Sequence, residues 1–487
     1  MTEVIDTSRR DFLRKASLLS AAGSFSAPFA LNLFSMNVAA ASTLTADYKA
    51  IVCLYLAGGN DSSNMVLATD TPSWTGYQSA RNIGGAASIA LPLSSLLPIV
   101  PITPKVDTVG IRAFALHPSM APLQALFDAG RAAVVANVGS LIEPIADKVA
   151  YRNNAIRKPA NLFSHSDQTT QWHSTDPAKP IYGWGGRMGD MLKASNTLQN
   201  FTSISSSGNS VFLAGETINQ YQINSNGTAV PIAGLTNLFG TSNNPLQAII
   251  TNTGASNLLE REHAAVVQRS IAAQTDLNSV LTVTATSVPV PAQYINPNTN
   301  LPATNSLANQ LRTVARIIAG QTTLGAHRQV FFVSMGGFDT HDGQLPSHAN
   351  LMARLAHAVS YFDNVLATSP LGDLRSNVTL FTASDFGRTF TSNGDGTDHG
   401  WGAHHFVVGG AVKGKEIYGN FPQTAVTNTS AGIDNPLDVG SGSTIPTTSV
   451  DQYAGTLAKW FGLSPAEITS VFPNLANFPI QDLGFMA

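Results

Sequence analysis

The chain has 487 residues, enough for one large α/β domain or two ordinary ones, and a net charge of −3 with only 12% charged residues. It has no basic run and no basic stripe interleaved with aromatic residues, which excludes nucleic acid as an expected partner. The single cysteine, Cys53, excludes an internal disulfide, and because it stands in an apolar run we expect it to be a small buried core residue.

The first 41 residues have the pattern of an export signal. Arg9-Arg10 is followed by Phe-Leu and more positive charge, then by a weakly apolar stretch to about Val38, and then by three alanines. This order is that of a twin-arginine signal peptide with its cleavage site. We therefore predict a signal peptide at residues 1–41, the twin-arginine translocase as a partner during export, and a periplasmic or extracellular mature protein. No later apolar run is long enough to span a bilayer, so no membrane span is expected after cleavage.

Apolar runs and helical spacing alternate along the remaining chain. The predicted strands are 49–57, 132–137, 329–334 and 378–383. The predicted helices are 118–130, 307–319, 351–366 and 450–462. Fully apolar strands that alternate with helices favour an α/β fold with a mainly parallel central sheet, covered by helices on both faces. We expect one domain at 42–487, with the Asn/Ser/Thr-rich residues 195–305 as an irregular insertion or cap and 424–449 as a surface loop.

Asp and His residues gather where the predicted strands end, which is where open parallel sheets bind their ligands. The clusters are residues 60–64, 336–342, 384–389 and 398–405. One Asp after a strand is more often a helix cap or turn former, but together these residues favour a divalent metal used for hydrolysis. The expected metal ligands are Asp61, Asp339, His341, Asp385, Asp398 and His399. The sequence leaves zinc, calcium, magnesium and manganese open.

Other polar residues are candidates for catalysis. Arg388 is suited to clamp an anionic oxygen with paired donors. Of the adjacent His404 and His405, we expect one to point into the site and the other to pack elsewhere. Ser164 or Ser166 is a candidate nucleophile, although a capped helix start explains these serines equally well. A serine-hydrolase triad is the rival mechanism, but no Gly-x-Ser-x-Gly elbow follows a predicted strand.

Several motifs together resemble a twin-arginine-exported bacterial family of undefined function, regarded as a divergent branch of the alkaline phosphatase/sulfatase superfamily. The resemblance spans about Tyr48 to the C-terminus. The motifs, besides the Arg pair, are Gly58-Gly59-Asn60-Asp61 and residues 163–166, 183–187, 336–342, 384–389 and 398–405. The resemblance implies an alkaline-phosphatase-like sheet with a metal site at its strand ends. It also implies a hydroxyl or thiol nucleophile that attacks a small anionic phosphate or sulfate ester.

The resemblance also suggests a role for individual positions. Asp61 resembles the metal-binding Asp after the first strand, and Asp339 with His341 resembles the Asp/His pair of a neighbouring metal. Asp385 resembles the late Asp, and His399, His404 or His405 resembles the closing His. The sequence departs from the superfamily where Phe386 stands directly after the late Asp in place of His, and where Asp339 and His341 lie unusually close.

Three hypotheses about function follow. The first is an exported metal-dependent hydrolase of phosphate or sulfate esters, with Ser164 as nucleophile. The second is a non-catalytic binding or assembly module in the periplasm or at the cell surface, on the same fold. The third is a metal-free serine esterase centred on Ser164 and His165.

Overall fold

The computed structural model describes residues 47–85, 88–107, 110–224, 227–228, 245–254, 257–423 and 435–487. The chain divides into two units, Met1–Tyr48 and Lys49–Ala487, and the second is described below. The predicted signal peptide at 1–41 lies outside the described residues, as do residues 424–434 of the predicted surface loop.

A central sheet of nine strands, counted over the described residues, forms the core of the second unit. Its order is β15-β7-β14-β13-β1-β12-β8-β9, with β16 also paired to β7. The strands are β1 Lys49–Ala57, β7 Ala132–Gly139, β8 Ser203–Ser205, β9 Tyr221–Gln222, β12 Arg328–Gly336, β13 Val378–Ser384, β14 Ala403–Val408, β15 Ile417–Tyr418 and β16 Thr448–Ser449. Only β14 runs antiparallel to its neighbours within this sheet as described. The predicted mainly parallel sheet is therefore confirmed.

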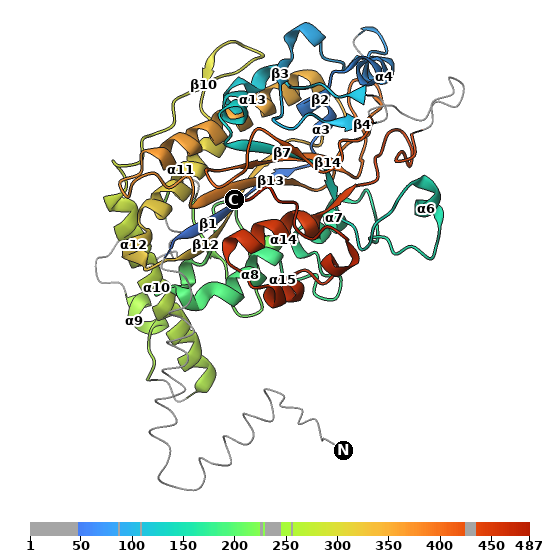
Figure 1. The fold of residues 1–487 in the computed structure, drawn as a ribbon. Helices are drawn as coiled ribbons and strands as arrows, with labels where there is room; N and C mark the ends of the chain where they lie inside the picture. Colours follow the sequence, from blue (N-terminus) through green and yellow to red (C-terminus); the bar gives the residue numbers. More distant parts are fainter. Residues whose placement is uncertain are drawn as a thin grey trace, which may run out of the picture. The chain divides into compact units, whose positions relative to one another are not determined.

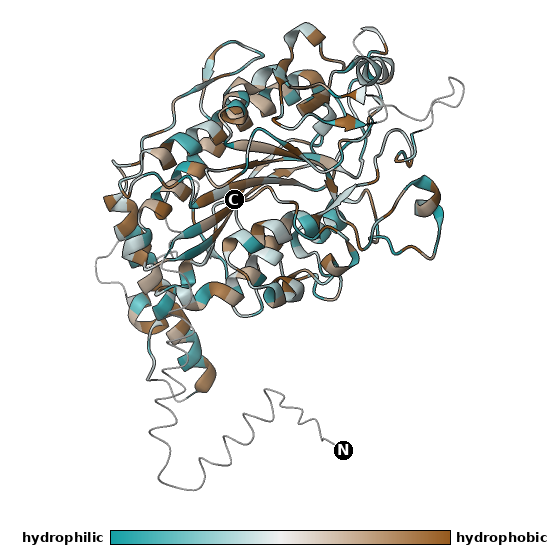
Figure 2. Ribbon diagram, in the orientation of Figure 1, coloured by the Kyte–Doolittle hydropathy of each residue, from teal (hydrophilic) through white to brown (hydrophobic). Residues whose placement is uncertain are grey.

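Helices cover both faces of the sheet (Figure 1). On one side lie α11 (Ser306–Ala319) and α13 (Gln344–Ala367), and on the other lie α8 (Trp184–Leu192), α14 (Val450–Phe461) and α15 (Pro465–Val471). Figure 2 shows the central strands as mainly hydrophobic and the helices as mixed, because each helix needs only one apolar face to pack on the sheet. All four predicted strands and all four predicted helices are present, although 118–130 is a short 3-10 turn followed by α5 (Ala121–Asp128).

The segment 195–305 differs from the expected insertion. Its strands β8 and β9 extend the central sheet beyond β12, so part of this segment belongs to the core. Its longest helix, α10 (Leu258–Val283), packs against α11 and α12 (Gln321–Leu324). The sequence did not predict these two strands, because each is too short to produce an apolar run within this polar segment.

Short elements complete the described fold. They are α3 Ser62–Met65, β2 Val66–Ala68, α4 Thr71–Arg81, β3 Leu97–Ile99, β4 Val106–Asp107, β5 Gly110–Ile111, β6 Phe114–Leu116, α6 Lys148–Arg152, α7 His165–Ser174, α9 Pro245–Ile250, β10 Tyr294–Ile295 and β11 Pro302–Ala303. Cys53 is buried in β1, as expected, and burial raises the pKa of its thiol. None of the described helices combines the length and apolar character needed to cross a membrane.

The parallel pairing brings three loops to one edge of the sheet. Leu56 of β1 lies level with Met335 of β12 and with Ser384 of β13. The segments that follow these strands therefore begin at the same height, and they carry the polar clusters predicted from the sequence.

Candidate metal centre

The loop after β1 holds the neighbouring loops in place. Gly58 has φ +118°, and a Cβ atom built on it would lie 2.4 Å from the backbone nitrogen of Asp339. Gly59 has φ +80°, and its Cβ would lie 2.3 Å from the ring of Phe386. Only glycine permits both this backbone conformation and this closeness. The Gly58-Gly59 pair thus lets the segments after β12 and β13 pack directly against the end of β1.

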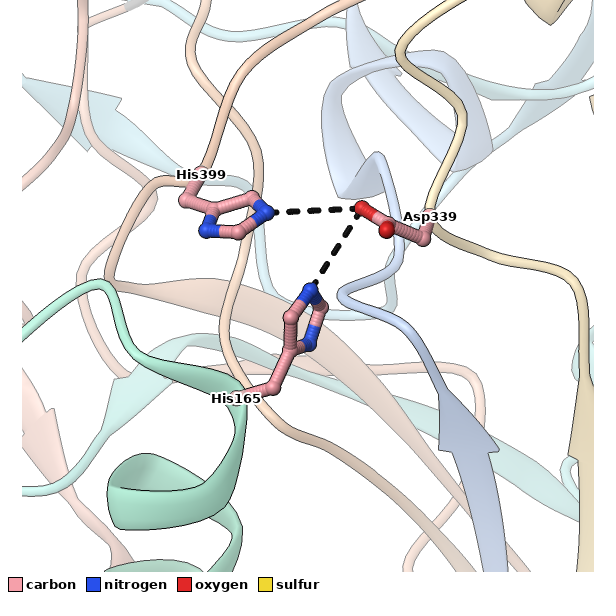
Figure 3. Close-up of side chains that lie close together, drawn as sticks. All are labelled: His165, Asp339 and His399. Carbon is pink, nitrogen blue, oxygen red and sulfur yellow. Dashed lines mark ion pairs between the residues drawn. The ribbon is translucent and has the colours of Figure 1, made fainter.

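Four side chains converge at this edge. The Oδ1 atom of Asp339 lies 3.1 Å from His341 Nε2, 3.4 Å from His399 Nε2 and 3.5 Å from His165 Nε2. The Nε2 atoms of His341 and His399 are 3.0 Å apart. Figure 3 shows His165, at the start of α7, and His399, ahead of β14, both directed at Asp339. Ligand atoms bound tetrahedrally to zinc at about 2.0–2.1 Å lie about 3.3 Å from one another. Three of these atoms, from His165, Asp339 and His399, all lie within 4.8 Å of one another, a spacing that suits one small metal ion.

Each of the three histidines has an oxygen beside its other ring nitrogen. The Nδ1 atom of His165 lies 2.8 Å from Asp385 Oδ2, and that of His399 lies 2.7 Å from the carbonyl oxygen of Phe163. The Nδ1 atom of His341 lies 3.2 Å from Asp398 Oδ1. An Nδ1 that donates its proton to such an oxygen leaves Nε2 with a free lone pair, which is the form that binds a metal.

Two further observations fit a cation bound at this place. His165 Nε2 is buried and makes no hydrogen bond to any group in the described part of the chain. Phe163, whose carbonyl holds His399, has φ +70°, a left-handed conformation that is rare for an aromatic residue and is typical of functional sites. His165, Asp339 and His399, with the partners that orient them, thus fit a metal ion by geometry and by chemistry.

The charge state of Asp339 is set by its neighbours. Burial alone would raise the pKa of its carboxyl, but the hydrogen bond and charge of Arg388 and the charge of His341 outweigh burial and lower it. Asp339 is therefore an anion at neutral pH. Burial lowers the pKa of His399, so this imidazole is neutral and able to bind a metal.

Arg388 differs from the anion clamp expected from the sequence. Its side chain is fully buried, and Nη1 donates to Asp339 Oδ1 at 2.6 Å and to the Gly58 carbonyl at 3.2 Å. Its other donors reach the hydroxyl and the carbonyl of Thr397. With its nitrogens engaged in this way, Arg388 positions the Asp339 carboxylate instead of meeting a substrate.

Asp61 also has a different role from the expected one. It is 0% exposed and forms an ion pair of 2.5 Å with Arg81, which is buried as well. The same carboxylate accepts hydrogen bonds from the Gln344 amide and from the backbone N–H of Ser63 at the start of α3. Because these donors occupy its oxygens, Asp61 is a buried structural anion beneath the loops and is not one of the converging ligands. Asp385 and Asp398 likewise bind histidines instead of converging with them.

The histidine pair on β14 lies away from the four converging residues. Burial lowers the pKa values of His404 and His405 to about 3. His404 stacks on Phe421 at 4.1 Å and accepts a hydrogen bond from the Asn137 backbone. His405 packs against Trp172 and Tyr453. Both are core residues, which corrects the expectation that one of them points into the site.

The sequence predicted Asp339, His341 and His399 as ligands, but it suggested His165 only as the partner of a serine nucleophile. The Ser164 hydroxyl instead donates to Asp167 Oδ2 at 2.6 Å. His165 carries no metal-ligand spacing to another residue, so nothing local in the sequence marks it as a ligand. Phe386, which departs from the superfamily pattern, packs its ring 4.8 Å from that of His165 and 4.7 Å from that of His399.

Among solved structures, the chain is similar to Ps i-CgsB in complex with a neocarrahexaose, with 8% identity over 86% of this chain and 74% of that one and a TM-score of 0.34. It is also similar to the PsFucS1 sulfatase from Pseudoalteromonas sp., with 10% identity over 88% and 71% of the two chains and a TM-score of 0.32. No curated protein matches the sequence. A family model matches residues 48–471, so the chain belongs to the family described as a protein of unknown function, DUF1501.

Proposed function

We propose that this protein is an exported, metal-dependent hydrolase of phosphate or sulfate esters, in which His165, Asp339 and His399 hold one divalent ion and His341 lies beside them. The observation that carries the proposal is the convergence of three Nε2 atoms on one carboxylate oxygen, with an oxygen beside every Nδ1. Imidazoles suit zinc, whereas calcium and magnesium prefer oxygen ligands. Zinc is therefore the proposed ion.

The chemistry proposed for the site combines this ion with a serine hydroxyl. A bound divalent ion polarises an ester oxygen and lowers the pKa of a neighbouring hydroxyl or water. Ser164 precedes His165 directly, and Asp167 accepts its proton in a hydrogen bond of 2.6 Å. Hydrogen bonds from Asn161 and Ser164 lower the pKa of Asp167, which keeps it ionised as an acceptor. Ser164 is the proposed nucleophile, and Asp167 orients its hydroxyl.

The N-terminus of α7 supports an anionic substrate. Ser164, its N-cap residue, makes no side-chain capping hydrogen bond. The first backbone N–H groups of a helix have no partner within the helix, and together with the helix dipole they favour an anion. Since Arg388 is bound to protein oxygens, these amides are the proposed donors to the ester group.

Metal analysis is the first test of this proposal. Mature protein purified from the periplasm without chelators should contain about one equivalent of zinc by mass spectrometry. His165→Ala and His399→Ala should lose the ion, whereas His263→Ala, which removes an exposed histidine of α10, should keep it. A panel of aryl phosphates and aryl sulfates should then reveal turnover that chelators abolish. Folded protein without stoichiometric metal would contradict the proposal.

A second candidate function is supported by the number of ligands. His341, whose Nε2 lies 3.1 Å from Asp339 Oδ1, would close the shell if it became a fourth ligand, and closed zinc sites are usually structural, whereas catalytic sites keep a position open. On this reading the protein is a metal-stabilised binding or assembly module without turnover. Bound zinc in a protein inactive on the whole ester panel would favour it. Ester turnover that is insensitive to chelators and is lost in Ser164→Ala would instead favour the metal-free serine esterase.

The proposed location of this activity is the periplasm or the exterior of the cell. It depends on the Arg9-Arg10 pair, the apolar stretch and the small residues that follow. Replacing both arginines by lysine should leave the uncut precursor in the cytoplasm, as measured by cell fractionation and immunoblotting. Unchanged periplasmic protein in this variant would contradict the twin-arginine route.

A further inference from the structure

A cavity of about 360 Å³ lies along α7. Asp167, Thr170, Gln171 and Ser174 line it, and at helical spacing these four share one face of α7. His165 falls on the opposite face of the same helix. The cavity is therefore separated from the candidate metal centre by the thickness of α7.

The walls of the cavity are mainly apolar. They come from the segment after β7, from a proline-containing segment after α6, from the segment after α7 and from the start of α14. The apolar residues are Leu141, Ile142, Pro159, Ala160, Pro177, Pro180 and Val450. Concave sites of this volume with apolar walls and a few polar groups are typical of small-molecule binding.

The charged groups that line the cavity are mainly acidic. Asp167, Asp176 and Asp451 line it together with a single cation, Lys158. The ammonium of Lys158 donates to the backbone carbonyls of Tyr151 and Asn153, so it is already engaged. The charge of the lining therefore favours a cationic ligand over an anionic one.

Asp451 differs from the other two acids of the lining, because it is buried and one of its carboxyl oxygens has no hydrogen bond. It is the second residue of α14 and only 2% exposed, and its Oδ1 makes no hydrogen bond within the described part of the chain. Arg187, a nearby cation, is directed to Asp176 at 3.4 Å and to the Ser174 carbonyl. Burial raises the pKa of Asp451 to about 8 despite the charge of Arg187. Backbone N–H groups of Asp451 and Asn474 bond this carboxyl, but its Oδ1 has no hydrogen bond, and an ammonium bound beside it would supply one and favour the ionised form.

We propose that this cavity binds a small organic amine, whose ammonium group pairs with Asp451 and whose apolar body packs against Leu141, Ile142 and Val450. The cavity residues do not include the four converging side chains at the sheet edge, so binding requires no metal. Asp167 lines the cavity and also accepts the hydrogen bond of Ser164, so amine binding and ester turnover are measured separately.

Calorimetric titration of the mature protein with phenethylamine tests this site. The amine should bind at one site, and 2-phenylethanol and phenylacetate, which keep the ring but lack the cation, should bind at least tenfold more weakly. Asp451→Asn should weaken amine binding at least tenfold. Asp128→Asn, which removes an exposed acid of α5, should leave the affinity unchanged.

A second variant separates loss of the site from loss of the fold. Ala160→Trp, at the exposed rim of the cavity, should narrow it and weaken amine binding without changing Asp451. In Asp451→Asn and in Ala160→Trp, the metal content and the circular dichroism spectrum should match those of the unmodified protein. No saturable amine binding, equal binding of the alcohol, or full affinity in Asp451→Asn would each overturn the proposal.

Discussion

At the candidate metal centre, each histidine is oriented by a residue distant in the sequence. Asp385 lies 220 positions from His165, and the Phe163 carbonyl lies 236 positions from His399. Asp385 is itself held by the backbone N–H of Gly58 at 3.0 Å. These contacts fix the ring orientation and direct Nε2 towards Asp339, which is the arrangement that the proposed ion requires.

Asp385→Ala should lower metal affinity by about 10- to 100-fold without removing a direct ligand, because His165 would lose its orienting carboxylate. Competition with a chromophoric zinc chelator would measure the change. Asp373→Ala, which removes a side chain outside the site that pairs with Arg375, is the matched control. Equal affinity in the two variants would show that Asp385 does not support the site.

The Asp61–Arg81 pair gives a contrasting prediction. Both side chains are buried, and removing one partner leaves the other charge unpaired. Asp61→Ala should therefore lower the free energy of unfolding by about 3–5 kcal/mol, measured by urea denaturation. The folded fraction should keep its metal. Metal loss with unchanged stability would instead identify Asp61 as a ligand.

At the scale of elements, the ends of β1, β12 and β13 act as one unit. Gly58 belongs to the loop after β1, yet its N–H holds Asp385 and its carbonyl accepts from Arg388, which in turn holds Asp339. One glycine therefore links the residues that orient two converging side chains. The close approach of these loops requires that position 58 have no side chain.

Gly58→Ala should disrupt this unit, because its Cβ would lie 2.4 Å from the Asp339 backbone. We expect at least a tenfold loss of metal affinity together with a lower melting temperature. Gly84→Ala is the matched control, since Gly84 also has positive φ, at +90°, but has no neighbour within 4 Å. It should cost only the backbone strain of about 1–2 kcal/mol and leave metal binding unchanged. Metal binding that survives in Gly58→Ala would contradict this view of the loop.

At the scale of the whole molecule, buried titratable groups determine how stability changes with pH. Burial lowers the pKa of five histidines to about 3 or 4, from an unfolded value of 6.5. They are His117, His173, His348, His404 and His405. Their stabilising contribution is present above pH 6.5 and is lost as pH falls, because the unfolded chain takes up protons that the folded chain cannot.

The pKa shift of Asp451 has the opposite effect on how stability changes with pH. Its pKa is raised to about 8 from 3.8, so its contribution is lost as pH rises towards 8. Stability should therefore increase from about pH 4 to 6.5 and decline from there to about pH 8. Each proton bound by one state only changes the free energy of unfolding by about 1.4 kcal/mol per pH unit. Denaturation curves across this range would measure the profile, and Asp451→Asn should remove the decline above pH 6.5. A free energy of unfolding that stays constant from pH 4 to 6.5 would contradict the prediction for the five histidines.

The sequence by itself determined the elements of the sheet and the place where polar side chains gather. Apolar runs mark β1, β7, β12 and β13 because these strands are buried on both faces. The polar clusters that follow three of these strands, β1, β12 and β13, predicted a metal site at this edge of the sheet. The short β8 and β9 have no apolar run, because they join the sheet by strand pairing: β8 pairs with β12, and β9 pairs with β8.

Only the tertiary structure decided which of these side chains meet. It brought His165 from α7 to Asp339, paired Asp61 with Arg81, and buried His404 and His405 beneath the sheet edge. The physical reason is that residue spacing determines on which face of a helix or strand a side chain lies. Contact between distant segments depends instead on strand order and packing. The antiparallel β14, between β13 and β7, sets the direction of its two histidines in a way that no local pattern predicts.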